Sequence, residues 1–141
     1  MILNLLEGIF SCSVDQSQAI ATLEQVIEIL ALKPDYAKAA SFSEKLGDFY
    51  RKAKCKDKIP ALRVKIAEFY EKEADTLDTK DSRNVHQILH YIQLAMNAWT
   101  KVEDKQESKM RRQLLAKKAK PLKDLRFQSL KATPGDAYDI T

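Results

Sequence analysis

The sequence predicts an all-α protein of about six antiparallel helices in stacked hairpins, arranged as a repeat-like array or as a helical bundle. Glycine and proline are scarce, with three and four copies in 141 residues, while the helix-favouring residues Ala, Leu, Lys and Glu are plentiful. Apolar residues recur at steps of three and four between short polar connections. The length suits one domain. We expect residues 1–131 to form it and residues 132–141 to be a disordered tail or a linker to a missing C-terminal part.

The first two helices are predicted at the apolar start of the chain. Residues 1–10 (MILNLLEGIF) have no basic start and include Glu7, which argues against a signal sequence and for a helix that begins abruptly. The second helix starts near Ser13, whose side chain can form a capping box with Gln16, and it ends before Pro34.

The third and fourth helices are predicted over about residues 35–53 and 60–77. Gly47 lies inside the third helix, where glycine costs about 1 kcal/mol relative to alanine, so we expect a neighbouring helix to cross close to it. Pro60 suits the first turn of the fourth helix. The residues expected to face the core from these two helices lie at helical spacing: Ala39, Phe42, Leu46, Phe49, Tyr50, Ala53, Leu62, Ile66, Phe69, Tyr70 and Leu77.

The fifth helix, residues 83–102, is predicted to be the central helix of the core. Its apolar residues form one stripe at steps of three and four: Val85, Ile88, Ile92, Ala95, Trp99 and Val102. Gln93, Asn97 and Lys101 lie on the other side of this helix and are expected to face water.

The sixth helix is predicted to follow residues 103–106 and to carry few apolar residues. Pro121 is expected to bend or stop it before a final short segment that contains Leu122, Leu125 and Leu130, because proline lacks the backbone N–H and clashes with the preceding turn.

The C-terminal part of the chain is strongly basic. Residues 105–131 hold ten Lys or Arg against two acids, a net charge of +8, so the rest of the chain carries −4 within the total of +4. The candidate basic patch consists of Lys109, Arg111, Arg112, Lys117, Lys118 and Lys120. This patch predicts contact with nucleic-acid phosphates or an acidic partner, or docking on the protein's own acidic strip between Glu68 and Asp81. Phe127 is the only aromatic among these basic residues, and no base-specific recognition is implied.

Residues 19–102 resemble tetratricopeptide repeats. Residues 28–39 (EILALKPDYAKA) are similar to the junction between two such repeats. Two sets of residues match the patterns of the family's first and second helices, the second set loosely: Leu46, Gly47 and Tyr50, and Ala95, Trp99 and Val102. The spacing from Pro34 to Leu46 is about three residues longer than in the family, and no strict repeat period is present. The resemblance implies longer or degenerate helical hairpins.

Residues 62–125 are also similar, in helix length and composition, to microtubule-interacting-and-trafficking domains, which are three-helix bundles. Either resemblance implies a non-catalytic module that holds a peptide or a partner helix in a groove between helices. We expect this groove beside the third and fifth helices. The candidate contact residues are three tyrosines and three basic residues that could clamp a carboxylate: Lys45, Tyr50, Arg51, Lys52, Tyr70 and Tyr91.

Arg83 and His90 are similar to the loose R-x6-H signature of HEPN ribonucleases, which are helical dimers that cleave RNA. The resemblance implies that His90 moves a proton and that Arg83 stabilises phosphate charge. This alternative predicts an enzyme. The sequence has no phosphate-binding loop and no nucleophile in a recognisable setting, so it predicts no other kind of catalysis.

Metal, cofactor and membrane sites are not predicted. His86 and His90 stand four residues apart on one helix, but a third ligand is missing. Cys12 and Cys55 lack metal-ligand spacing and are expected to be free thiols in a reducing compartment. No apolar run approaches the length of a membrane span. We therefore expect a soluble, cytoplasmic interaction or scaffolding module with a protein or peptide partner, whose oligomeric state the sequence does not define.

Overall fold

The structure is a computed structural model that describes residues 14–140, with side chains described for residues 16–126. Every regular element in this range is helical. The five α-helices are α2 (Val14–Leu32), α3 (Tyr36–Lys52), α4 (Ile59–Thr76), α5 (Val85–Thr100) and α6 (Lys105–Ile140), and two short 3-10 turns, η1 (Lys56–Lys58) and η2 (Ser82–Asn84), precede α4 and α5.

The predicted all-α class is therefore confirmed, but the described part holds five α-helices where we expected about six in the whole chain. The predicted helix over residues 1–10 and the capping box that begins at Ser13 lie outside the described residues.

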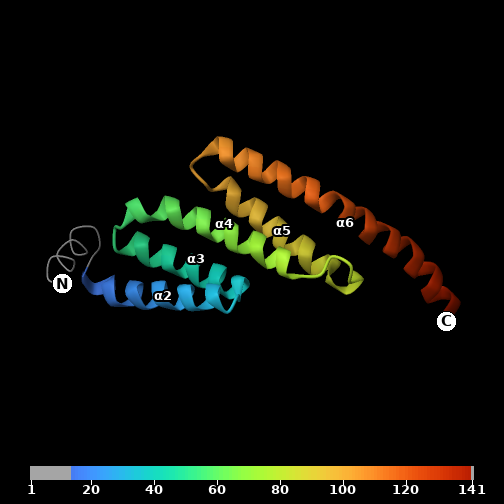
Figure 1. The fold of residues 1–141 in the computed structure, drawn as a ribbon, viewed down its shortest axis with the longest axis horizontal. Helices are drawn as coiled ribbons and strands as arrows, with labels where there is room; N and C mark the ends of the chain where they lie inside the picture. Colours follow the sequence, from blue (N-terminus) through green and yellow to red (C-terminus); the bar gives the residue numbers. More distant parts are fainter. Residues whose placement is uncertain (1–13, 141) are drawn as a thin grey trace.

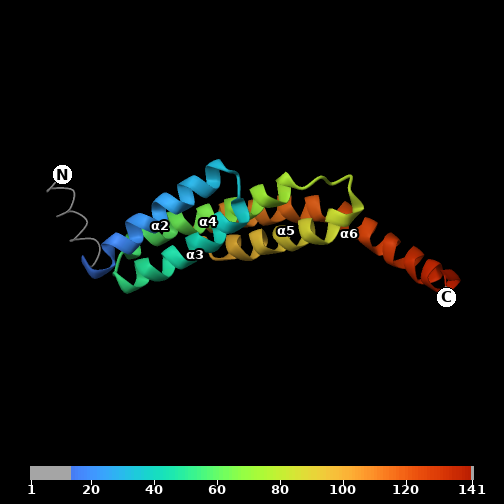
Figure 2. The same ribbon diagram turned by 90° about the horizontal axis from the view of Figure 1, so that it is seen from below.

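The helices lie side by side in the order of the sequence, each antiparallel to the one before it (Figure 1). Each α-helix packs mainly against its neighbours in the chain, and in the view from below the helices overlap instead of lying in one row (Figure 2). This arrangement is an open array in which α2 and α6 are the two outer helices of the described part.

The apolar core has two parts, and α4 belongs to both. The first cluster joins α2, α3 and one face of α4, whereas the second joins another face of α4 to α5 and α6. Tyr70 of α4 packs against both clusters. The stripe predicted for α5 is confirmed, since Ile88, Ile92 and Trp99 are at most 1% exposed. Burial of this stripe is the main physical reason that α5 is held between α4 and α6.

A polar bond from an aromatic side chain ties each of three successive helices to the helix before it. The donors and acceptors are Tyr50 Oη to Glu24 Oε2 at 3.0 Å, Tyr70 Oη to Glu44 Oε1 at 3.0 Å, and Trp99 Nε1 to Glu71 Oε2 at 2.5 Å. Each bond satisfies a partly buried donor that would otherwise lose its hydrogen bond to water. These bonds therefore help to set the register between neighbouring helices.

α6 continues through Pro121, so the expected stop that would separate a final short segment is wrong. Leu115, Ala119 and Leu122 lie on both sides of the proline and are buried in the cluster with α5. Packing of this continuous apolar face compensates for the backbone hydrogen bond that a proline cannot donate. The helix extends to Ile140, past residue 131, where we placed the end of the domain.

Cys55 is fully buried and disulfide-bonded, so the prediction of a free thiol is wrong at this position. Cys12 lies outside the described residues. The inference of a reducing compartment rested on free thiols and loses that basis, so the cytoplasmic location stays a prediction. Within residues 14–140, no helix has an apolar stretch long enough to cross a bilayer.

Candidate functional site

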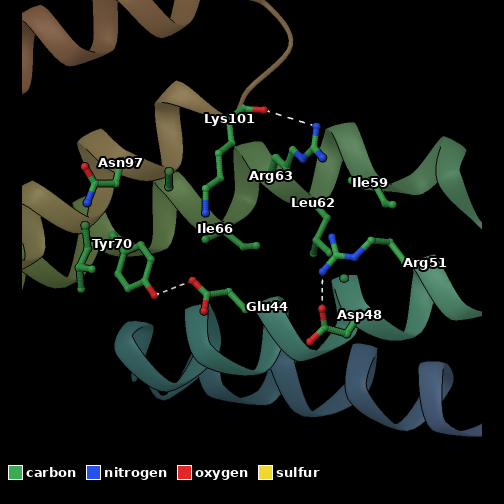
Figure 3. A pocket seen from close by; sticks show the side chains of 13 residues that line it. Glu44, Asp48, Arg51, Ile59, Leu62, Arg63, Ile66, Tyr70, Asn97 and Lys101 are labelled. Carbon is green, nitrogen blue, oxygen red and sulfur yellow. Dashed lines mark hydrogen bonds and ion pairs between the residues drawn. The ribbon is translucent and has the colours of Figure 1, made fainter.

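A groove of about 440 Å³ runs over α4 between α3 and α5 (Figure 3). Its floor is α4, which presents Leu62 and Ile66, and its walls come from α3 and from the end of α5. The groove exists because α3 and α5 both pack on α4 and not on each other. Small residues face it on both walls, Gly47 on α3 and Ala98 on α5, and they keep it open.

The close helix crossing predicted at Gly47 is not found, because the neighbouring helix leaves room for a side chain there. A Cβ atom at this position would lie 3.4 Å from Leu62 Cδ2 and 3.9 Å from Arg51 Nη1. Both distances are ordinary van der Waals contacts, so α4 leaves room for one methyl group beside α3.

The acidic side chains of the groove already have partners. Tyr70 donates a hydrogen bond to Glu44 across the groove, and Asp48 forms an ion pair with Arg51 one turn later on α3 (Figure 3). Burial raises the pKa of Tyr70 well above its usual value, and the hydrogen bond to the Glu44 carboxylate raises it further. Tyr70 therefore stays a neutral donor at physiological pH.

The groove becomes cationic toward the end of α5. Arg63 Nη1 donates to the Lys101 carbonyl oxygen at 3.5 Å. The same atom lies 3.9 Å from Glu103 Oε1, and this ion pair is weak because both side chains are partly exposed to water. The Lys101 side chain extends across the groove toward Ile66 (Figure 3). Its ammonium group has no hydrogen bond or ion pair with any described residue. Asn97 lies one helical turn before Lys101 and accepts a hydrogen bond from Gln93 at 2.9 Å.

A second, smaller hollow of about 360 Å³ lies over α3, between α2 and α4. As in the first groove, a tyrosine donates a hydrogen bond to a glutamate here, from Tyr50 to Glu24. Burial raises the pKa of Tyr50, and this hydrogen bond raises it further. Lys58 lies 5.7 Å from the centre of the Tyr50 ring, at cation–π distance.

The structure brings two of the six predicted contact residues, Arg51 and Tyr70, into the main groove, and it places Tyr50 in the second hollow. The other three lie elsewhere. Lys45 and Lys52 extend over the rings of Phe42 and Phe49, and Tyr91 packs beside His90 with ring centres 5.4 Å apart: these contacts are local to α3 and α5.

Sequence reasoning did not select Arg63, Asn97 or Lys101, although all three line the groove. Asn97 and Lys101 were assigned to the water-facing side of α5, and both are indeed exposed. Their spacing of four residues was a usable signal, because it places both side chains on one face beside the predicted core stripe.

Arg83 and His90, the residues of the ribonuclease alternative, lie in different elements. Arg83 belongs to η2 and is held by Asp81, to which its Nε and Nη2 atoms donate at 3.1 and 3.0 Å. Hydrogen bonds from the Arg83 side chain and backbone lower the pKa of Asp81. His90 is exposed on α5. Ribonuclease chemistry stays a prediction. Among the described residues, no group of three metal-ligating side chains accompanies His86 and His90.

Five of the six residues of the predicted basic patch on α6 fall into two sets, and the sixth, Arg112, donates from Nε to the Ser108 carbonyl oxygen at 3.3 Å. Arg111 lies 3.5 Å from Glu71 and 3.7 Å from Glu68, and its guanidinium covers the Trp99 ring at 5.1 Å. Lys118 forms an ion pair with Asp75. These side chains bind α4 across α5, as one of the sequence hypotheses proposed. The second set is exposed and has no ion pair with any described residue: Lys109, Lys117 and Lys120.

Comparison of the chain with protein-family models, curated proteins and solved structures finds no match.

Proposed function

We propose that this chain is a non-catalytic protein-interaction module that holds a segment of a partner protein in the groove over α4. The observation that carries the proposal is the convergence of three successive helices on one open hollow of about 440 Å³. Ligand sites in proteins commonly measure about 300–1,000 Å³ and combine an apolar lining with a few placed polar groups. Leu62 and Ile66 supply the apolar floor, and Lys101 supplies a charge with no partner of its own among the described residues.

The chemistry of the groove favours a peptide that carries a carboxylate next to an apolar side chain. Arg51 compensates the negative charge of Asp48, and Tyr70 donates a hydrogen bond to the Glu44 carboxylate. Lys101 and the weakly paired Arg63 remain at the α5 end, where an acidic side chain or a C-terminal carboxylate gains charge-assisted hydrogen bonds. An apolar side chain beside that carboxylate would cover Ile66.

The tetratricopeptide-like character of the chain is part of this proposal. Successive antiparallel helices that each pack on their neighbours are compatible with it. Leu46 and Tyr50 are buried at the positions that the family's first-helix pattern assigns to core residues, and Gly47 is buried between them. A scaffolding role would follow from the same groove, because a chain that binds one partner there without catalysis brings it close to any second partner that the chain binds.

The test starts from random peptides displayed on phage and selected on the purified chain of 141 residues. Selected peptides are synthesised with a fluorescent label and titrated by anisotropy. We expect enriched peptides to contain Asp, Glu or a free C-terminus beside an apolar residue. The double variant Arg63→Glu/Lys101→Glu should bind them at least tenfold more weakly, because two attractive charges become repulsive.

A matched variant, Lys33→Glu/Lys80→Glu, makes the same change in net charge at two exposed positions away from the groove. It should bind the selected peptides like the unmodified chain. If both double variants lose affinity for the peptides equally, the loss comes from the overall charge, and the groove is refuted as the binding site.

A further inference from the structure

The outer face of α6 combines exposed apolar residues with lysines that no described residue pairs. Met110, Leu114 and Leu125 are 54%, 55% and 43% exposed, although large apolar side chains are usually buried. They recur at helical spacing beside the buried stripe of Leu115 and Leu122, so they lie along one side of the helix. This stripe spans about 22 Å of helix at 1.5 Å per residue.

Lysines lie within and beside this stripe. Lys117 and Lys120 line a shallow hollow of about 530 Å³ together with Met110 and Leu114, and Lys109 borders the adjoining hollow of about 620 Å³. None of the three lysines has an acidic partner among the described residues, whereas Arg111 and Lys118 on the other flank are bound by α4. The protein's own acids therefore account for one flank of α6 only.

We propose that this outer face of α6 docks an acidic amphipathic helix of a partner protein. Apolar residues of the partner helix cover Met110 and Leu114, and its glutamates or aspartates pair with Lys109, Lys117 and Lys120. The occupant is a helix because the exposed apolar positions follow a straight helical stripe, and facing helices interdigitate along such ridges. Charge complementarity sets the acidic character of the partner.

The chain already contains this kind of contact. Across α5, the acids of α4 meet the bases of α6 through the ion pairs of Arg111 and Lys118. Glu68, Glu71 and Asp75 stand on one face of α4 at steps of three and four. A partner helix with acidic residues at such steps could form the same kind of ion pairs with the exposed lysines of α6.

The composition of the face favours a protein partner over a membrane or a nucleic acid. Lys117 lies in line with Leu114 in the apolar stripe, where insertion into hydrocarbon would bury its charge but a carboxylate would neutralise it. A phosphate backbone would bind the lysines and leave the three exposed apolar residues unused. The described part of α6 also offers no aromatic side chain on which a base could stack.

The probe for the test is a designed, fluorescently labelled helical peptide of about 18 residues, with leucines along one face and glutamates on both flanks. The chain is titrated with it, and amide shifts in NMR spectra locate the contact. We expect micromolar binding and shifts centred on Met110, Leu114 and Lys117. Leu114→Glu and Lys117→Glu/Lys120→Glu should each weaken binding about tenfold, and unchanged Trp99 fluorescence verifies their fold.

Two variants and three further probes make the result decisive. Lys33→Glu/Lys80→Glu controls for net charge, and Arg63→Glu/Lys101→Glu separates this face from the proposed groove; both should retain the affinity of the unmodified chain. The same peptide with lysines for glutamates should not bind. Tighter binding of phosphatidylserine vesicles or of a single-stranded oligonucleotide, or amide shifts confined to the groove over α4, would overturn the proposal.

Discussion

Replacing Gly47 with alanine should stabilise the protein, although glycine at this position matches a helical-repeat pattern in which close packing would forbid a side chain. Gly47 lies in the interior of α3, where alanine is better than glycine by about 0.8–1.0 kcal/mol. The added methyl group would meet Leu62 Cδ2 at 3.4 Å, a normal contact, so no strain offsets this gain. Burial of the methyl adds at most about 0.8 kcal/mol. We expect a net increase of about 1–1.5 kcal/mol in the free energy of unfolding.

Urea unfolding followed by the fluorescence of Trp99, the only tryptophan of the chain, measures this change. Ser41→Ala is the matched control because Ser41 is exposed on the same helix. It should gain only the smaller difference in helix propensity, about 0.5 kcal/mol. A Gly47→Ala variant that is less stable than the unmodified chain by 1 kcal/mol or more would refute the reasoning, because it would mean that Leu62 leaves no room for a methyl group at position 47.

Three further predictions concern the contacts between helices. Trp99→Ala, followed by the circular dichroism of the helices because it removes the fluorescent probe, should lower the free energy of unfolding by about 3–5 kcal/mol in urea titrations, since Trp99 is fully buried and its indole N–H is bonded. Arg111→Ala should cost about 1–2 kcal/mol by the same measurement, since it leaves half-buried carboxylates of α4 with fewer partners, whereas Lys118→Ala at an exposed ion pair should cost less than about 1 kcal/mol. Burial and hydrogen bonds to glutamates raise the folded-state pKa of Tyr50 and Tyr70 above the unfolded value of about 10, so their contribution to stability is complete below about pH 10 and is lost as the pH rises beyond it. Urea midpoints measured through this range, with Tyr→Phe variants as controls, should show that loss.

The sequence predicted the core of this array well because the core obeys a periodicity. The stripe from Val85 to Trp99 is buried as expected. The prediction failed at Pro121, where a local rule for helix ends competed with tertiary packing. Apolar residues continue at helical spacing on both sides of that proline, and their burial against α5 decides the outcome.

The candidate groove was only partly predictable because it depends on which helices are not in contact. Sequence periodicity identifies the buried face of α5 but not the distance between α3 and α5 on the far side of α4. Asn97 and Lys101 therefore looked like ordinary water-facing residues, and their role as a wall of the groove appears only once α4 separates the two helices. The tyrosines were expected to contact a partner, whereas the hydrogen bonds of Tyr50 and Tyr70 tie neighbouring helices together.

Gly47 connects the stability of the array with the proposed function. A glycine in a helix interior reduces stability, and here the neighbouring helix leaves room for a methyl group, so packing alone does not require it. The same residue forms part of the groove wall opposite the α5 side chains. A side chain larger than methyl, as in Gly47→Leu, would project beside Leu62 and take up volume that a bound peptide needs. If the groove is the binding site, Gly47→Ala should raise the stability of the chain and should lower its affinity for the selected peptides less than Gly47→Leu does. The loss of affinity would then follow the volume of the side chain at position 47 and not the stability of the fold.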